Sequence, residues 1–167
     1  DFLKYNKYTG RAVLEFGAGQ STHWWAHRAA QVVSFEADRA WYEEVRRSIP
    51  SNATVYHIAD NLSGFDELVH DQSFDVVIVD GLDRVVAAEK ALRHLKSDGC
   101  IIVDNSEGHW GPPGTYPIMD LFRKNGYRRI DFYGHAPGVL LSHCTSLFFR
   151  DDCFLLAGIE NPVRSNN

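Results

Sequence analysis

Short apolar runs alternate with longer amphipathic stretches along most of the chain. The clearest run, Val76-Val77-Ile78-Val79, is continuous and β-branched, which is typical of a strand buried on both faces of a parallel sheet. Between such runs apolar residues recur at helical spacing, as in Arg84–Leu95. The chain therefore predicts alternating strands and helices, and this alternation favours a parallel sheet with helices on both faces.

The predicted strands are, in order, Ala12–Phe16, Gln31–Glu36, Thr54–Ala59, Phe74–Asp80, Cys100–Val103, Arg128–Tyr133 and Ser146–Arg150, with Leu156 as an alternative end of the last one. The predicted helices are Thr22–Ala30, Arg39–Ile49, Gly64–His70, Arg84–Leu95 and Ile118–Lys124. Lys96–Gly99 is a predicted helix break, and the Gly- and Pro-rich stretch Ser106–Pro117 is a predicted functional loop. No repeat or linker divides the chain, so residues 1–167 are expected to form a single domain with its core over about 10–158.

Acidic residues stand at the ends of the first five predicted strands: Glu15, Glu36, Asp60, Asp80 and Asp104. Right-handed crossovers bring the carboxyl ends of parallel strands to one edge of a sheet, where such folds bind ligands. One carboxylate at a strand end is often only a helix cap or a solubilising residue. Five on one edge predict an acidic site, which suits hydroxyl-rich or cationic ligands.

The first of these acids opens the motif Glu15-Phe16-Gly17-Ala18-Gly19, which Gln20-Ser21-Thr22 follows. It predicts a strand that turns sharply into a helix. Glycine lets the backbone pass close beneath a ligand, and the helix N-terminus offers free N–H groups. Gly-x-Gly also occurs in ordinary tight turns, so the motif by itself does not name the ligand.

Taken together, Glu15-Phe16-Gly17-Ala18-Gly19, Phe35-Glu36, Ala59-Asp60-Asn61 and Val77-Ile78-Val79-Asp80 resemble the class I S-adenosylmethionine-dependent methyltransferases. The resemblance covers residues 10–158. It implies an α/β fold, a Rossmann-like doubly wound sheet of seven strands in the order 3-2-1-4-5-7-6. The last strand of the chain is then antiparallel to its neighbours.

The resemblance also implies a set of cofactor-binding residues: Glu15, Gly17, Gly19, Glu36, Asp60 and Asp80. The glycine turn would pass under the methionine part of S-adenosylmethionine, and Glu15 would hold its amino group directly or through water. Glu36 would accept hydrogen bonds from the ribose hydroxyls, a task that suits a carboxylate because it only accepts. Asp60 would meet the adenine amino group, and Asp80 would lie near the methionine end.

A second set, Asp80, Asp104 and Asn105, resembles the metal ligands of catechol-type O-methyltransferases. There Mg²⁺ binds oxygen ligands and chelates two neighbouring substrate hydroxyls, lowering the pKa of the attacking one. The Lys often found three residues after the first metal Asp is Asp83 in this chain. Relatives without a metal carry similar residues as turn caps, so both readings stay open.

A catalytic base that needs no metal is expected at His109, in the Gly- and Pro-rich loop after the fifth strand, because His titrates near neutral pH. An exposed loop histidine is the competing interpretation. His109 and Asp80 are thus the predicted catalytic residues. His135 and His143 lie over the same edge. Trp110, Tyr116 and Tyr133 are candidates for a platform under a flat or sugar-like acceptor, with anchoring of the loops into the core as the competing interpretation.

Composition narrows the class of protein. The net charge of −5 argues against a large nucleic-acid footprint, and no signal peptide or apolar run of membrane-spanning length is recognisable, so neither nucleic acid nor a membrane is an expected partner. Three cysteines fit reduced thiols rather than a disulfide framework, which favours a cytoplasmic location. Composition leaves the oligomeric state open.

The leading functional hypothesis is methyl transfer from S-adenosylmethionine to an oxygen of a small molecule or glycan. A dinucleotide-binding oxidoreductase is the obvious competitor, but Thr22 stands where its third glycine would be, and Asp60 is then unexplained. A catalytically silent Rossmann-like binding module and an aminopropyl-type transferase are further alternatives.

Overall fold

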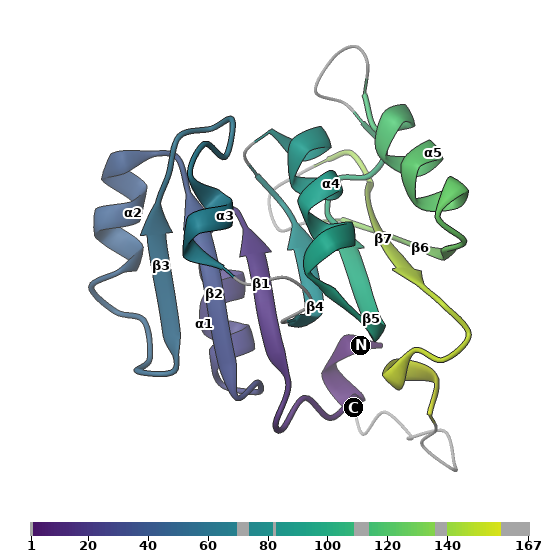
Figure 1. The fold of residues 1–167 in the computed structure, drawn as a ribbon, viewed down its shortest axis with the longest axis horizontal. Helices are drawn as coiled ribbons and strands as arrows, with labels where there is room; N and C mark the ends of the chain where they lie inside the picture. Colours follow the sequence, from purple (N-terminus) through teal and green to yellow (C-terminus); the bar gives the residue numbers. More distant parts are fainter. Residues whose placement is uncertain (1, 70–73, 82, 109–113, 136–139, 158–167) are drawn as a thin grey trace.

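The computed structural model describes residues 2–69, 74–81, 83–108, 114–135 and 140–157, which form one seven-stranded sheet with helices on both faces (Figure 1). The strands are β1 (Ala12–Phe16), β2 (Gln31–Glu36), β3 (Ala53–His57), β4 (Phe74–Val79), β5 (Leu95–Val103), β6 (Arg128–Gly134) and β7 (His143–Phe149). The helices are α1 (Gln20–Ala26), α2 (Arg39–Val45), α3 (Phe65–Leu68), α4 (Arg84–His94) and α5 (Tyr116–Lys124), with 3₁₀ turns at Leu3–Tyr5 and Phe154–Leu156.

The strand order is β3-β2-β1-β4-β5-β7-β6. The first five strands pair in parallel, whereas β7 runs antiparallel to both β5 and β6. The predicted order and the predicted antiparallel strand are both confirmed. Because β1 to β5 are parallel, their carboxyl ends meet at one edge of the sheet. This is the edge at which the predicted ligand-binding residues are expected.

Neighbouring residues of β1 enter different cores, as the period of a strand requires. Leu14 packs with residues of α4 and α5, while Val13 packs with Trp25 of α1 on the other face. Figure 1 shows the same division, with α3, α4 and α5 in front of the sheet and α1 behind it. The central strands are therefore covered on both sides, which explains their continuous apolar sequences.

The largest error in the predicted boundaries concerns β5, which begins at Leu95 and not at Cys100. Lys96–Gly99 was a predicted break, yet the chain there is already extended, and the pairing with β4 shifts between Phe74 and Val76. A Cβ on Gly99 would lie 2.7 Å from the carbonyl oxygen of Asp75. Glycine thus marks a close passage of two strands here rather than the end of a helix.

Helix ends differ from the prediction in a consistent way. Helix α1 spans Gln20–Ala26 rather than Thr22–Ala30, and α2 ends at Val45, before the predicted Ile49. Helix α3 covers only Phe65–Leu68. Apolar spacing continues into the turns that follow helices, so periodicity alone extends them too far.

Strand ends show smaller differences. Strand β3 spans Ala53–His57 rather than Thr54–Ala59, and β7 begins earlier than predicted, at His143, and ends at Phe149. Leu156 lies in a 3₁₀ turn and not in a continuation of β7.

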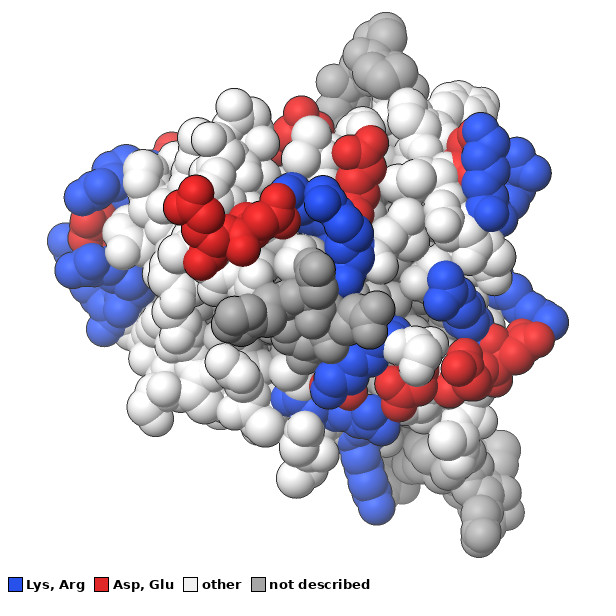
Figure 2. All heavy atoms as spheres, in the orientation of Figure 1, with Lys and Arg blue, Asp and Glu red and all other residues white. Residues whose placement is uncertain are grey.

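The surface drawn in Figure 2 carries acidic and basic side chains in small mixed groups. Ion pairs within the helices include Arg39 with Glu43 on α2 and Arg123 with Asp120 on α5. Of the helices that the structure describes, none is long and apolar enough to cross a membrane. The three cysteines are buried and free.

Candidate functional site

The glycine turn after β1 is pressed against the backbone that follows β4. Gly17 has φ +99°, a conformation that favours glycine, and its N–H donates to the Phe35 carbonyl at 2.8 Å. A Cβ on Gly17 would lie 3.0 Å from the backbone nitrogen of Gly81. Gly17 was a predicted site residue. Gly81 was not, although its place directly after the acid that ends β4 was a signal for it.

Glu15 is completely buried and braces the first turn of α1 from below. Its Oε2 accepts hydrogen bonds from Thr22 Oγ1 at 2.5 Å and from Ser34 Oγ at 2.6 Å. Thr22 Oγ1 in turn accepts the Gly19 N–H at 2.9 Å. Burial raises the pKa of Glu15. The other oxygen, Oε1, is buried and has no hydrogen-bond partner among the described residues.

Glu36 ties the end of β2 to the same turn. Its Oε2 accepts the Ala18 N–H at 3.2 Å, and its Oε1 accepts the Asp38 N–H at 2.8 Å. On the other side of the turn Trp41 Nε1 donates to the Ala18 carbonyl at 2.7 Å, while 44% of the residue stays exposed. Trp41 was not a predicted binding residue, because an aromatic residue at helical spacing is typical of a core position.

These groups line one pocket of about 370 Å³, formed by residues 17–21, Glu36, Trp41, Asp80 and Gly81. Four of the six predicted cofactor residues, Gly17, Gly19, Glu36 and Asp80, therefore share a pocket. The remaining two do not line it: Glu15 lies buried below the turn, and Asp60 is exposed, three residues after the end of β3. The backbone carbonyl of Asp60 accepts the N–H of Asp83 at 3.1 Å.

Asp80 forms the boundary between this pocket and a second polar region. Burial, followed by the neighbouring Asp104 carboxylate, raises the pKa of Asp80 to about 7. Arg84 opposes this effect: its Nη2 lies 3.5 Å from Asp80 Oδ1, and its Nη1 donates to the Asp104 carbonyl at 2.5 Å. Asp83 caps α4 by accepting the N–H groups of Val85 and Val86.

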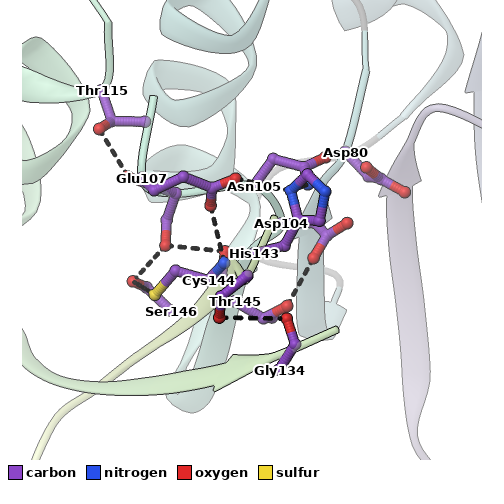
Figure 3. Close-up of polar contacts among 12 residues, drawn as sticks. Asp80, Asp104, Asn105, Glu107, Thr115, Gly134, His143, Cys144, Thr145 and Ser146 are labelled. Atoms are coloured by element: carbon purple, nitrogen blue, oxygen red, sulfur yellow. Dashed lines mark hydrogen bonds and ion pairs between the residues drawn. The ribbon is translucent and has the colours of Figure 1, made fainter. Parts of the chain in front are cut away.

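The second region gathers polar side chains from the segment after β5 and from β7 (Figure 3). Nδ1 of His143 donates to Glu107 Oε1 at 2.8 Å, and the Asn105 side-chain amide lies 3.0 Å from the same nitrogen. Glu107 Oε2 accepts the Cys144 N–H at 2.7 Å. Burial alone would raise the pKa of Glu107, but these hydrogen bonds outweigh it and hold the pKa below its usual value.

The predicted metal ligands are engaged by the protein itself. Asp104 Oδ1 accepts from Thr145 Oγ1 at 2.5 Å, and Asn105 faces His143. In the described ranges no group of three or more His, Cys, Asp or Glu is placed to hold a metal ion. The magnesium set of Asp80, Asp104 and Asn105 stays a prediction that this geometry does not strengthen. His109, the predicted base, and Trp110 lie outside the described residues.

Solved structures share this fold. A Klebsiella pneumoniae protein assigned to the O-methyltransferases matches with a TM-score of 0.70 and 18% identity, over 84% of this chain and 73% of that one. A Geobacter metallireducens precorrin-6y C5,15-methyltransferase matches with a TM-score of 0.66 and 15% identity, over 89% and 84%. The Burkholderia thailandensis 1,6-didemethyltoxoflavin N1-methyltransferase, solved with S-adenosylhomocysteine, matches with a TM-score of 0.61 and 14% identity, over 85% and 72%.

No protein-family model matches the sequence, and no curated protein matches it either. At these low identities the likeness establishes the fold, which is that of the class I methyltransferases. What the chain binds and catalyses has to be argued from its own site.

Proposed function

We propose that this protein is an S-adenosylmethionine-dependent methyltransferase whose cofactor binds in the pocket at the glycine turn. One observation carries the proposal: the glycine turn, Glu36 and Asp80 come from the ends of three different strands and line the same pocket. Such a pocket offers close backbone approach, an acceptor for hydroxyl groups and a carboxylate for a positive charge.

The residues present fit this cofactor. Gly17, Gly19 and Gly81 line the pocket without a side chain, so a ligand can approach their backbone closely. Glu36 is held by two backbone N–H groups, and each of its oxygens keeps a lone pair for a ribose hydroxyl. Oε1 of Glu15 has no hydrogen-bond partner among the described residues and lies beneath the turn, outside the pocket, so we assign it the cofactor's amino group through a bridging water.

The rim of the pocket carries a carboxylate, Asp80, that can stabilise a positively charged ligand. When bound, S-adenosylmethionine would supply an electrophilic sulfonium methyl group for in-line displacement by an acceptor oxygen, with S-adenosylhomocysteine as the leaving group and His109 as the predicted acceptor of the hydroxyl proton. Asp80, at the rim, favours positive charge beside it when ionised, and Arg84 holds the backbone at the ends of β4 and β5 in place. Positioning and charge stabilisation would thus provide most of the catalysis.

We propose a hydroxyl of a small molecule or glycan as the methyl acceptor. The support comes from the polar groups beyond Asp80, namely Asp104, Asn105, Glu107 and His143, which suit hydroxyl-bearing ligands. The solved structures do not decide this point, because an N-methyltransferase and a C-methyltransferase share the fold as well.

Two alternatives make different predictions. A dinucleotide-binding oxidoreductase would bind NAD, but its usual sheet ends in a further parallel strand, whereas β7 here is antiparallel. A silent binding module would bind neither cofactor.

Calorimetric titration with S-adenosylmethionine, S-adenosylhomocysteine and NAD tests all three possibilities. We expect both sulfur nucleosides to bind and NAD not to bind. Glu36→Ala should weaken binding of S-adenosylhomocysteine by about 1–3 kcal/mol, the cost of losing a charged hydrogen-bond partner. Asp120→Ala, on the exposed face of α5, is the matched control and should bind like the wild type. If neither of the two sulfur nucleosides binds, the proposal is refuted.

The magnesium prediction has a separate test. Activity that is lost in EDTA and restored by Mg²⁺ would support the set of Asp80, Asp104 and Asn105. Activity that survives EDTA would rule this set out and leave the cofactor proposal intact.

A further inference from the structure

A second pocket has a volume of about 310 Å³. It lies between the segment after β5, the start of α5 and the strands β6 and β7. Its lining includes Ser106, Tyr116, Arg129, Asp131, Tyr133 and Ser146. Three of these, Arg129, Asp131 and Tyr133, alternate along β6 and so point to the same face of the sheet.

Part of the lining is a chain of buried hydroxyl groups that ends in a carboxylate. Ser106 Oγ lies 2.7 Å from Ser146 Oγ, and Ser146 Oγ donates to Asp131 Oδ1 at 2.6 Å. Ser106 and Ser146 are both buried. Ser146 gives its proton to Asp131, and the Ser106 hydroxyl has two acceptors within reach, Ser146 Oγ and the Cys144 carbonyl oxygen at 3.1 Å.

Asp131 is fixed in direction by these contacts. Arg129 Nε also binds Oδ1, at 3.0 Å, so the partners of Asp131 converge on one oxygen. Among the described residues Oδ2 has no hydrogen-bond partner. The pocket thus holds a carboxylate oxygen that can accept from a ligand, next to a guanidinium whose remaining N–H groups can donate.

Two tyrosine rings belong to the same pocket and are largely exposed, Tyr116 by 84% and Tyr133 by 73%. An exposed aromatic ring offers an apolar face and a polar tip. Glu107 and Asp131 against Arg129 leave one excess negative charge in the lining, which disfavours phosphorylated and carboxylated ligands.

We propose that this pocket binds a neutral polyhydroxylated ring, a sugar residue, with its hydroxyl groups on Asp131 and Arg129 and its C–H face on the tyrosines. A catechol would fit less well, because it has only two hydroxyl groups with which to hydrogen-bond to Asp131 and Arg129. The inference rests on the proposed methyltransferase function, because it takes the sugar to be part of the methyl acceptor. Ser106 of this lining comes two residues after Asp104, whose carboxylate neighbours Asp80 of the proposed cofactor pocket.

Saturation-transfer difference NMR on the whole chain tests the inference, with the methyl glycosides of glucose, galactose, mannose, fucose and rhamnose, and with catechol, as probes. We expect at least one glycoside to receive saturation at its ring protons. Its affinity should fall about fivefold or more in Asp131→Asn and in Tyr133→Ala, as expected for one lost hydrogen bond or ring contact. Phe132→Ala is the control, because Phe132 is the next residue on β6 and lines the opposite face; its affinity should match the wild type.

The outcomes separate the two proposals when S-adenosylhomocysteine is titrated into the same samples. If no glycoside binds, or if binding is equal in Asp131→Asn and the wild type, the sugar site is wrong even where the nucleoside binds. Preference for catechol also overturns it. If a glycoside binds as expected and neither sulfur nucleoside binds, the sugar-site proposal is supported and the methyltransferase proposal fails.

Discussion

Gly17, at the end of β1, and Gly81, after β4, pack backbone against backbone, so that a Cβ on either residue would lie 3.0 Å from the other's main chain. This contact fixes the height of the glycine turn above the sheet. It also joins the two strand ends between which the proposed cofactor lies.

Gly17→Ala should therefore both strain the turn and push the two strand ends apart. We expect a loss of about 2–4 kcal/mol in the free energy of unfolding, measured by urea denaturation, from the positive φ together with the steric contact. Gly126→Ala is the matched control: its φ is +79°, but nothing lies within 4 Å of its Cβ position. It should cost about 1 kcal/mol. Equal losses in the two variants would contradict the role given to the contact.

Glu15 should make stability depend on pH. Its pKa in the folded protein is raised above the ordinary 4.5 by burial, so between these two values the folded state binds more protons than the unfolded state. Stability contributed by this group is therefore present at low pH and lost as pH rises through the folded pKa. Glu15→Gln should remove that component, so the difference in melting temperature between variant and wild type should grow in favour of the variant as pH increases. A difference that is independent of pH would contradict this.

Asp80 should make cofactor affinity rise with pH, whereas the stability contributed by Glu15 falls with pH. Its pKa is about 7, and a cationic ligand beside it favours the ionised form. Affinity for S-adenosylmethionine should rise about tenfold between roughly pH 6 and pH 8, because the carboxyl must lose its proton before it attracts the ligand. Calorimetry at the two pH values measures this, and Asp80→Asn should bind with an affinity that hardly changes between them. A wild-type affinity that falls as pH rises would contradict the assignment.

Trp41 should report on the glycine turn. Its indole donates to the Ala18 carbonyl and lines the proposed cofactor pocket, so a bound nucleoside should change its fluorescence. Trp41→Phe should abolish this change and weaken binding by about 0.5–1.5 kcal/mol through the lost hydrogen bond. Trp25→Phe, with the residue buried behind the sheet, is the control that should keep the signal.

Much of the fold was predictable because strands buried on both faces have a distinctive sequence. The continuous run at Val76–Val79 and the acids after each parallel strand identified the sheet and its carboxyl edge. Glycine misled the prediction once: Gly99 was interpreted as a helix break, whereas its small size lets β5 pass Asp75. Local sequence does not distinguish these two uses of glycine.

The site was predictable only where its residues follow strands. Glu36 and Asp80 are of this kind. Glu107 and His143 are 36 residues apart and meet only because β7 turns back beside β5, so no spacing in the sequence reveals their contact. Glu15 had the right position but turned out to lie under the turn rather than in the pocket, because Thr22 and Ser34 draw its carboxylate inward.

The strand β6 lies at the outer edge of the sheet and pairs only with β7, and three residues of the proposed sugar pocket belong to it. The proposed cofactor pocket is built from β1, β2 and β4 in the interior of the sheet. An edge strand tolerates new side chains more readily than a central one, since fewer neighbours depend on its packing. Under the proposed function, acceptor preference should accordingly be open to redesign by changes on a single strand, with the proposed cofactor pocket left as it is.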